Sequence, residues 1–190
     1  LAGRFLSPGL FDSHVPGAAG RDRMEGTAEA FQAICDYHPG GGTTSLLLTT
    51  VTAALGEVVR VLGAIEREMG RQVLADADPH LPEGGVHKGA AIWQLRGAHV
   101  EGPFISREKR GAQRADFIIE PRAELVASLL ENPGAIKRVT LAPEVAGAPE
   151  LIARLTTAGI ASSGGHSNAW EEEARAGCER GMRQDTHTFN

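Results

Sequence analysis

Strand-like and helix-like segments alternate along this 190-residue chain, and this alternation most limits the folds it can adopt. Short apolar runs predict strands near residues 9–12, 44–51, 97–101, 136–141, 159–166 and 182–189. Apolar residues at helical spacing predict helices over residues 27–37, 55–69, 122–131, 149–158 and 170–180. Residues 75–90 carry Asp, Pro and Gly that break any period, so a loop is expected there. Six β-α units in series predict a parallel sheet with right-handed crossovers.

Two arrangements satisfy such a sheet: an open, doubly wound sheet and a closed (β/α)8 barrel. The barrel is favoured because chemically active residues end several different strands, whereas an open sheet gathers its site at one switch point. Six predicted strands fall two short of the eight that a barrel needs. The chain also begins without Met beside a strand, and we therefore expect it to be incomplete.

The composition is that of an ordinary globular protein. Hydrophobic residues make up 42% of the chain, charged residues 23%, and the formal net charge is −5. No basic cluster favours nucleic acid, and a mildly acidic chain gains nothing at an anionic membrane surface. No signal peptide or transmembrane-length apolar run is present, and Cys35 and Cys178 lack the spacing of a metal or redox pair. We expect a cytoplasmic protein with neither nucleic-acid nor membrane partners.

Three of the predicted strands end in side chains that bind metals. Glu101 ends an apolar run and precedes Gly-Pro, while His166 and His187 stand at the ends of the fifth and sixth predicted strands. Because the carboxyl ends of parallel strands meet at one edge, these side chains can come together there. A carboxylate and two imidazoles are a set that closes around one divalent cation.

Each of these residues has a simpler alternative role. Glu101 could be a buried carboxylate paired with Arg or Lys, and a single histidine on an apolar run is more often a satisfied core residue. His14 is either a second-metal ligand or the remnant of a lost ligand pair. His99 lies two residues before Glu101 on the same face of the strand, so it either lines the site or supports its ligands from behind, or else packs in the core.

Six short motifs in order suggest a family. They lie at residues 8–15, 42–45, 99–104, 141–144, 165–169 and 186–190. Together they resemble those of the N-acetylglucosamine-6-phosphate deacetylases of the amidohydrolase superfamily. The resemblance covers nearly the whole chain. It implies a (β/α)8 TIM-type barrel whose first six β-α units are present and whose flanking β-sandwich is missing, with residues 1–190 forming a partial metal-dependent hydrolase barrel domain.

The resemblance also implies an activity, namely removal of the acetyl group from N-acetylglucosamine 6-phosphate to give glucosamine 6-phosphate and acetate. Glu101, His166 and His187 match the family's ligands for one divalent metal, zinc, with iron or another divalent ion as the alternative. Ala112, Gln113 and Asn190 match positions that contact the substrate. The implied partner is a small amino-sugar phosphate, and the implied assembly is a homodimer.

Two departures from the family pattern leave other functions open. Many members have His-x-His after the first strand for a second metal, but this chain has His14-Val15-Pro16, so a two-metal site is not expected. The family's catalytic Asp would lie beyond Asn190, which leaves the catalytic residue of this chain unknown. The alternatives are therefore a catalytically silent chain that at most binds a metal, and an amidohydrolase with another substrate. The unpaired edges of a six-stranded sheet also predict aggregation or association.

Overall fold

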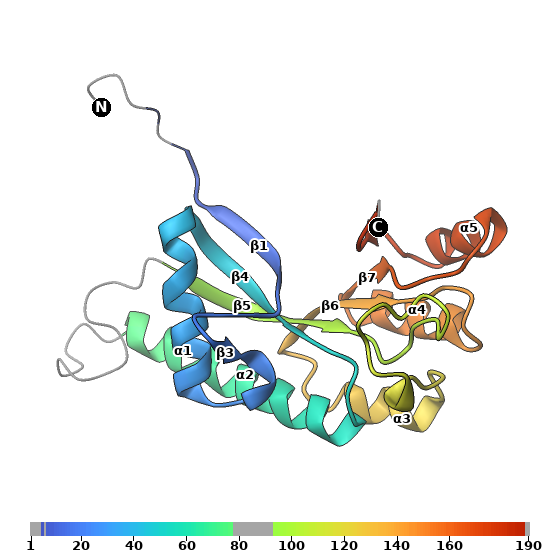
Figure 1. The fold of residues 1–190 in the computed structure, drawn as a ribbon, viewed down its shortest axis with the longest axis horizontal. Helices are drawn as coiled ribbons and strands as arrows, with labels where there is room; N and C mark the ends of the chain where they lie inside the picture. Colours follow the sequence, from blue (N-terminus) through green and yellow to red (C-terminus); the bar gives the residue numbers. More distant parts are fainter. Residues whose placement is uncertain (1–4, 6, 78–92, 189–190) are drawn as a thin grey trace.

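A curved parallel sheet forms the centre of the computed structural model, which describes residue 5 and residues 7–77 and 93–188 (Figure 1). Its strands, in spatial order, are β1 (Leu10–Val15), β4 (Thr43–Thr50), β5 (Gln94–Glu101), β6 (Ile136–Leu141), β7 (Ala161–Gly164) and β8 (Gln184–Asp185). All neighbouring strands pair in parallel. Because this order follows the chain without reversal, the described sheet has no switch point and the doubly wound alternative is wrong. The curved sheet is instead like part of a barrel.

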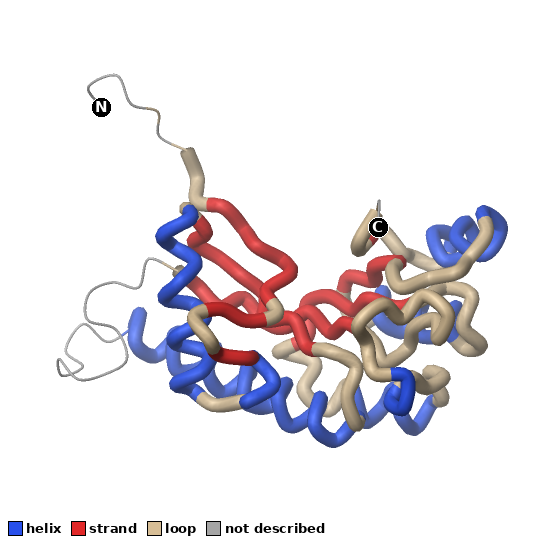
Figure 2. Tube along the Cα trace, in the orientation of Figure 1, coloured by secondary structure: helices blue, strands red, loops and turns tan. Residues whose placement is uncertain are grey.

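Helices follow the strands and pack on the convex side of the sheet (Figures 1 and 2). They are α1 (Ala28–Tyr37), α2 (Leu55–Ala77), α3 (Ala123–Leu129), α4 (Ala148–Thr157) and α5 (Glu171–Glu179). The Thr27 side chain accepts a hydrogen bond from the Ala30 amide and caps α1, as the sequence predicts. None of the helices within the described ranges has the length and apolar character to cross a membrane.

Some predicted boundaries are wrong. Helix α2 continues past Met69 to Ala77, so residues 75–77 of the expected loop are helical. The rest of that expected loop, residues 78–90, lies outside the described part of the chain. Strand β8 is much shorter than the predicted run of residues 182–189, since a left-handed backbone at His187 (φ 61°) ends the extended conformation.

A small excursion after β1 was not predicted. The two-residue strands β2 (Gly17–Ala18) and β3 (Arg21–Asp22) pair antiparallel, and the 3-10 helix η1 (Arg23–Glu25) follows them. Two further 3-10 helices, η2 (His38–Gly41) and η3 (Ala115–Phe117), lie in the connections. Strands this short are difficult to predict because they lack a hydrophobic period.

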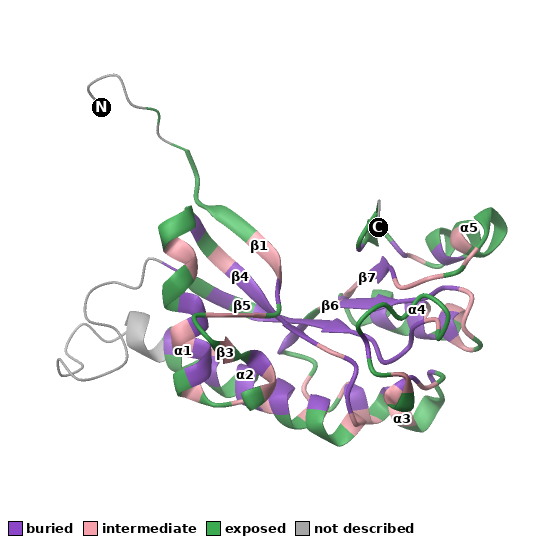
Figure 3. Ribbon diagram, viewed as in Figure 1, coloured by how far each residue is buried: buried purple, intermediate pink, exposed green. Residues whose placement is uncertain are grey.

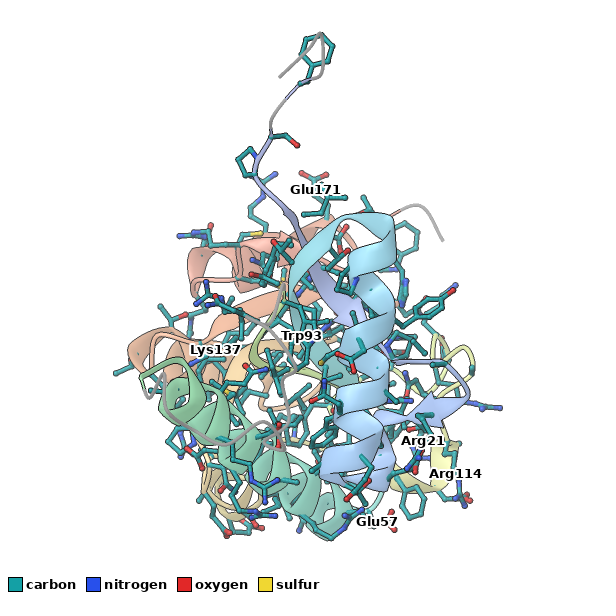
Figure 4. The ribbon with its side chains drawn as sticks, turned by 90° about the vertical axis from the view of Figure 1, so that its left-hand side faces the viewer. Arg21, Glu57, Trp93, Arg114, Lys137 and Glu171 are labelled. Carbon is teal, nitrogen blue, oxygen red and sulfur yellow. The ribbon has the colours of Figure 1, made fainter. Side chains whose placement is uncertain are left out.

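The hydrophobic core lies between the sheet and the helices, where the central strands are buried (Figure 3). In β5, Ala98 and Val100 pack in this core, so His99 and Glu101 point to the concave side of the sheet. The side chain of Trp93, labelled in Figure 4, donates from Nε1 to Asp36 Oδ1 at 2.8 Å. This hydrogen bond holds the segment before β5 against α1. Alternate side chains of β5 thus face the hydrophobic core and the concave side of the sheet.

Candidate metal centre

Glu101 stands at the carboxyl end of β5, with only 5% of its surface exposed. The chain turns sharply after it at Gly102, whose φ is 76°. A Cβ atom at Gly102 would lie 2.1 Å from Thr52 Oγ1, so both the backbone angle and the space require glycine. The turn leaves the carboxylate at the end of the strand, facing the loops of its neighbours.

Three imidazoles approach one oxygen of this carboxylate. The Nε2 atoms of His187, His166 and His14 lie 3.1, 3.2 and 3.8 Å from Glu101 Oε1. The potential ligand atoms of His14, Glu101 and His187 all lie within 4.8 Å of one another. A carboxylate oxygen has two lone pairs, so it does not need three nitrogens to complete its hydrogen bonding. The arrangement suits a cation held between neutral imidazoles and a carboxylate.

The second atoms of these groups are also fixed. His166 Nδ1 lies 3.1 Å from the carbonyl oxygen of Lys109, which can only accept, so Nδ1 carries a proton. Nε2 can then either hold a second proton that it donates to Glu101 or, in the neutral ring, bind a metal. Gln113 donates from Nε2 to Glu101 Oε2 at 2.8 Å and accepts from the Thr52 amide at 2.8 Å. Metal-binding histidines and carboxylates are commonly held in this way. The residues present therefore fit a metal centre.

Backbone strain is concentrated at the same place. Among the described residues other than glycine, only Ala19, His166 and His187 have positive φ angles. The values at the two histidines, 49° and 61°, are left-handed conformations that cost free energy in an L-residue. Such strain is typical of functional sites, where the surrounding structure imposes it.

The electrostatics favour an ionised carboxylate. Burial opposes ionisation of Glu101, but the hydrogen bond from His166 and the charges of the nearby imidazoles outweigh it and lower its pKa to about 2. The Glu101 hydrogen bond raises the pKa of His166, whereas burial lowers the pKa of His14. At neutral pH the centre therefore contains a carboxylate beside a neutral His14 imidazole.

His99 lies behind this group and is fully buried. Burial, together with the charges of Arg138 and His14, lowers its pKa to about 3, so the ring is neutral. Its nitrogens contact the Ser13 carbonyl and the Thr140 hydroxyl, at 3.1 and 2.6 Å. These contacts place His99 in a polar layer behind the Glu101 carboxylate.

The other predicted site residues are placed differently. Gln113 is buried against Glu101, with its amide oxygen and nitrogen both engaged, while Ala112 is exposed in the same loop. Asn190 lies outside the described residues.

Arg138 and Thr140 of β6 were not predicted from the sequence. Arg138 donates to Ser13 and Thr186, and Thr140 contacts His99, so both lie behind the centre. The two charged residues Lys137 and Arg138 inside a strand were the available signal for Arg138.

Comparisons with known proteins support the resemblance seen in the sequence motifs, although no family model matches the sequence. The chain is 31% identical over 190 residues to an N-acetylglucosamine-6-phosphate deacetylase of Lysinibacillus sphaericus, covering all of this chain and 45% of the relative. The enzymes of the same name from Bacillus subtilis and Homo sapiens are each 33% identical, and the alignments cover 97% and 99% of this chain. This chain spans 43% of each.

Solved structures agree with the sequence matches. N-acetyl-D-glucosamine-6-phosphate deacetylase from Mycobacterium smegmatis, solved as a mutant in complex with N-acetyl-D-glucosamine-6-phosphate, matches with a TM-score of 0.81 at 29% identity. The Thermotoga maritima enzyme matches with a TM-score of 0.75 at 30% identity. Each match covers 96% of this chain and 43% or 44% of the solved chain. The resemblance is thus confirmed: this chain is similar along its whole length to N-acetylglucosamine-6-phosphate deacetylases and spans less than half of the length of each.

Proposed function

We propose that this chain carries the metal-binding part of an N-acetylglucosamine-6-phosphate deacetylase. The observation that carries the proposal is the convergence of three histidine nitrogens on Glu101 Oε1 in a chain similar to these enzymes throughout. In this proposal residues 1–190 are a partial metal-dependent hydrolase domain of the (β/α)8 barrel type. The order and curvature of the six described strands support it.

The proposed ligands are Glu101, His166 and His187, with His14 beside them. Imidazole nitrogens with one carboxylate suit zinc, and iron or another divalent ion is the alternative. A bound divalent ion supplies Lewis acidity, which lowers the pKa of water and polarises a carbonyl group. Gln113 holds the Glu101 carboxylate through Oε2, and the carbonyl oxygen of Lys109 holds the His166 ring. Both side chains are therefore oriented before a metal binds.

The reaction in this proposal is hydrolysis of the acetamide of N-acetylglucosamine 6-phosphate. Water adds to the amide carbonyl carbon, the C–N bond breaks, and acetate and glucosamine 6-phosphate leave. The departing amine needs a proton, which we expect from an Asp in sequence that follows Asn190. Ala112, Gln113 and Asn190 are the proposed substrate contacts. A cytoplasmic location and a homodimer complete the proposal, and size-exclusion chromatography tests the latter.

The test measures bound metal and acetate release on the same preparation. We expect the purified chain to hold about one divalent ion per molecule and the Glu101→Gln variant to hold none. Acetate release from N-acetylglucosamine 6-phosphate supports the full proposal. Metal without turnover, in a protein that also carries the expected Asp, supports the catalytically silent alternative, and release from other amides supports a different substrate. A chain that binds no more metal than Glu101→Gln overturns the metal centre.

A further inference from the structure

A closed set of hydrogen bonds lies directly behind the metal centre. It joins five strands, or the residues next to them, through polar side chains that face the concave side of the sheet. Its members are Ser13, His99, Arg138, Thr140, Ser163 and Thr186, which we call the polar ring. The described atoms of this ring include no carboxylate. None of the six matches a position to which the family resemblance gives a catalytic or metal-binding role.

Arg138 of β6 is the junction of the ring. Its Nη1 donates to Ser13 Oγ at 3.0 Å, across the concave side on β1. Its Nη2 lies 2.8 Å from both Ser163 Oγ and Thr186 Oγ1 and 2.9 Å from the carbonyl oxygen of Asp185. One guanidinium therefore connects the two outermost parts of the described sheet, which the strand order keeps apart. A planar group with five donors is suited to this role.

The proton positions around the ring follow from its fixed acceptors. The Ser13 carbonyl can only accept, so His99 Nδ1 donates to it and the neutral ring presents Nε2 as an acceptor. Thr140 Oγ1, 2.6 Å away, must then donate to Nε2. The Thr186 hydroxyl, 2.8 Å from Thr140 Oγ1, donates to Thr140 and accepts from Arg138. The hydrogen bonds thus run in one direction, from Arg138 to the backbone of β1.

Three members of the polar ring are close in sequence to the residues around Glu101. Thr186 precedes the proposed ligand His187, His99 is two residues before the proposed ligand Glu101, and Ser13 precedes His14. Strand β6 itself supplies none of the proposed ligands. Moreover, the pairing of β1 with β4 shifts register between Asp12 and Val15, and His187 has a left-handed backbone, so strand geometry alone does not set these side chains. The ring contacts the backbone at Ser13, which lies within the register shift of β1, and at Asp185, which is the last paired residue before His187.

We propose that Arg138 and Thr140 are positioning residues that hold the proposed ligands Glu101 and His187, and His14 beside them, in the geometry that binds the metal. The proposal rests on the proposed metal centre and assigns β6 a role in it. Neither residue is a proposed ligand. Both act through the orientation of the ligand strands, so their loss should weaken binding without removing a ligand. Partners that orient metal ligands typically contribute about 10- to 100-fold in affinity.

The experiment compares Thr140→Val with Thr140→Ser in the full chain. Valine keeps the shape but removes the hydroxyl that His99 and Thr186 need, whereas serine keeps it. Cobalt(II) is the probe, because competition with a chromophoric chelator gives its affinity and its d–d absorption reports the coordination geometry. We expect Thr140→Val to bind cobalt about 10- to 100-fold more weakly with an altered d–d band, and Thr140→Ser to stay within about threefold of the unmodified chain.

Arg138→Met and Arg138→Lys form a second pair, which decides the question if Thr140→Val does not fold. The methionine variant should weaken cobalt binding as Thr140→Val does, and the lysine variant should recover part of the loss because it keeps a donor. Arg122→Met, at a guanidinium whose side chain is 67% exposed, is the matched control and should bind as the unmodified chain does. Thermal unfolding in the presence of chelator separates stability from affinity.

The outcomes separate this inference from the proposed function. If the unmodified chain binds cobalt, and Thr140→Val and Arg138→Met bind it with the same affinity and spectrum even though they unfold at lower temperature, the polar ring is only structural and the inference is overturned. If the unmodified chain binds cobalt no better than Glu101→Gln, the metal centre itself is overturned and the inference falls with it.

Discussion

The two ends of the strands differ in chemistry. At the carboxyl ends, ionisable side chains converge on Glu101 and two histidines have strained backbones. At the amino ends, a cavity of about 460 Å³ is lined by Phe11, Leu47, Met69, Gln72, Val73, Gln94, Leu95, Arg96 and Lys137. In barrel-like sheets the carboxyl ends hold the chemistry and the amino ends support stability. We therefore expect substitutions at the carboxyl ends to change metal affinity and substitutions at the amino ends to change mainly stability.

The largest expected effect is on metal affinity at the carboxyl ends. His187→Ala should lower it by more than about 100-fold, because this imidazole belongs to the ligand set whether His14 or His166 completes it. His166→Ala should have a larger effect than His14→Ala, since His166 lies closer to Glu101 Oε1 and is anchored by a backbone carbonyl. Metal competition titrations measure the order. His38→Ala, in η2 before β4, is the control, and an equal loss there would remove the contrast.

The opposite behaviour is expected in the core beneath the sheet. Leu62 of α2 is fully buried, and Leu62→Ala should reduce the free energy of unfolding by about 2–5 kcal/mol through lost burial and a residual cavity. Metal affinity of the folded fraction should stay within about threefold. Urea unfolding in the presence of chelator, followed by cobalt titration well below the midpoint, tests both statements. A variant that is stable but binds metal weakly would contradict the separation.

The buried His99 should make stability depend on pH. Its pKa is about 3 in the folded chain and near 6.5 when unfolded, so the unfolded state binds the proton more readily between these values. The stabilisation is therefore present above pH 6.5 and is lost as pH falls toward 3. Between pH 7.5 and 5 the loss should be about 2 kcal/mol. Urea unfolding with chelator measures it, and the His99→Gln variant should show a smaller slope. An unchanged slope would show that His99 is not the group responsible.

The smallest effect is expected at the amino-end cavity. Val73 is 67% exposed on α2, and Val73→Ser should change the free energy of unfolding by no more than about 0.5 kcal/mol, since little apolar surface is lost and the two residues have similar helix propensities. Metal affinity should not change. The same urea and cobalt measurements compare it directly with Leu62→Ala on the same helix. A loss of affinity here would mean that the two ends are coupled.

Much of the fold is predictable from local sequence. Strand β6 and the cap of α1 at Thr27 lie where the pattern predicts, because apolar periodicity and capping act over a few residues. The end of β8 does not, since the left-handed backbone at His187 is imposed by contacts with β5. The sequence also identified Glu101, His166 and His187 as a group from residue type and position at strand ends.

What the sequence by itself determined, then, was the alternation of strands and helices and the kind of side chain placed at each strand end, both of which are local properties. Only the tertiary structure decided that His14 joins the group around Glu101 and that Arg138 reaches Ser13. The physical reason is distance along the chain: Arg138 and Ser13 are 125 residues apart, and the hydrogen bond between them exists only because the sheet curves. Curvature is a property of all six described strands together.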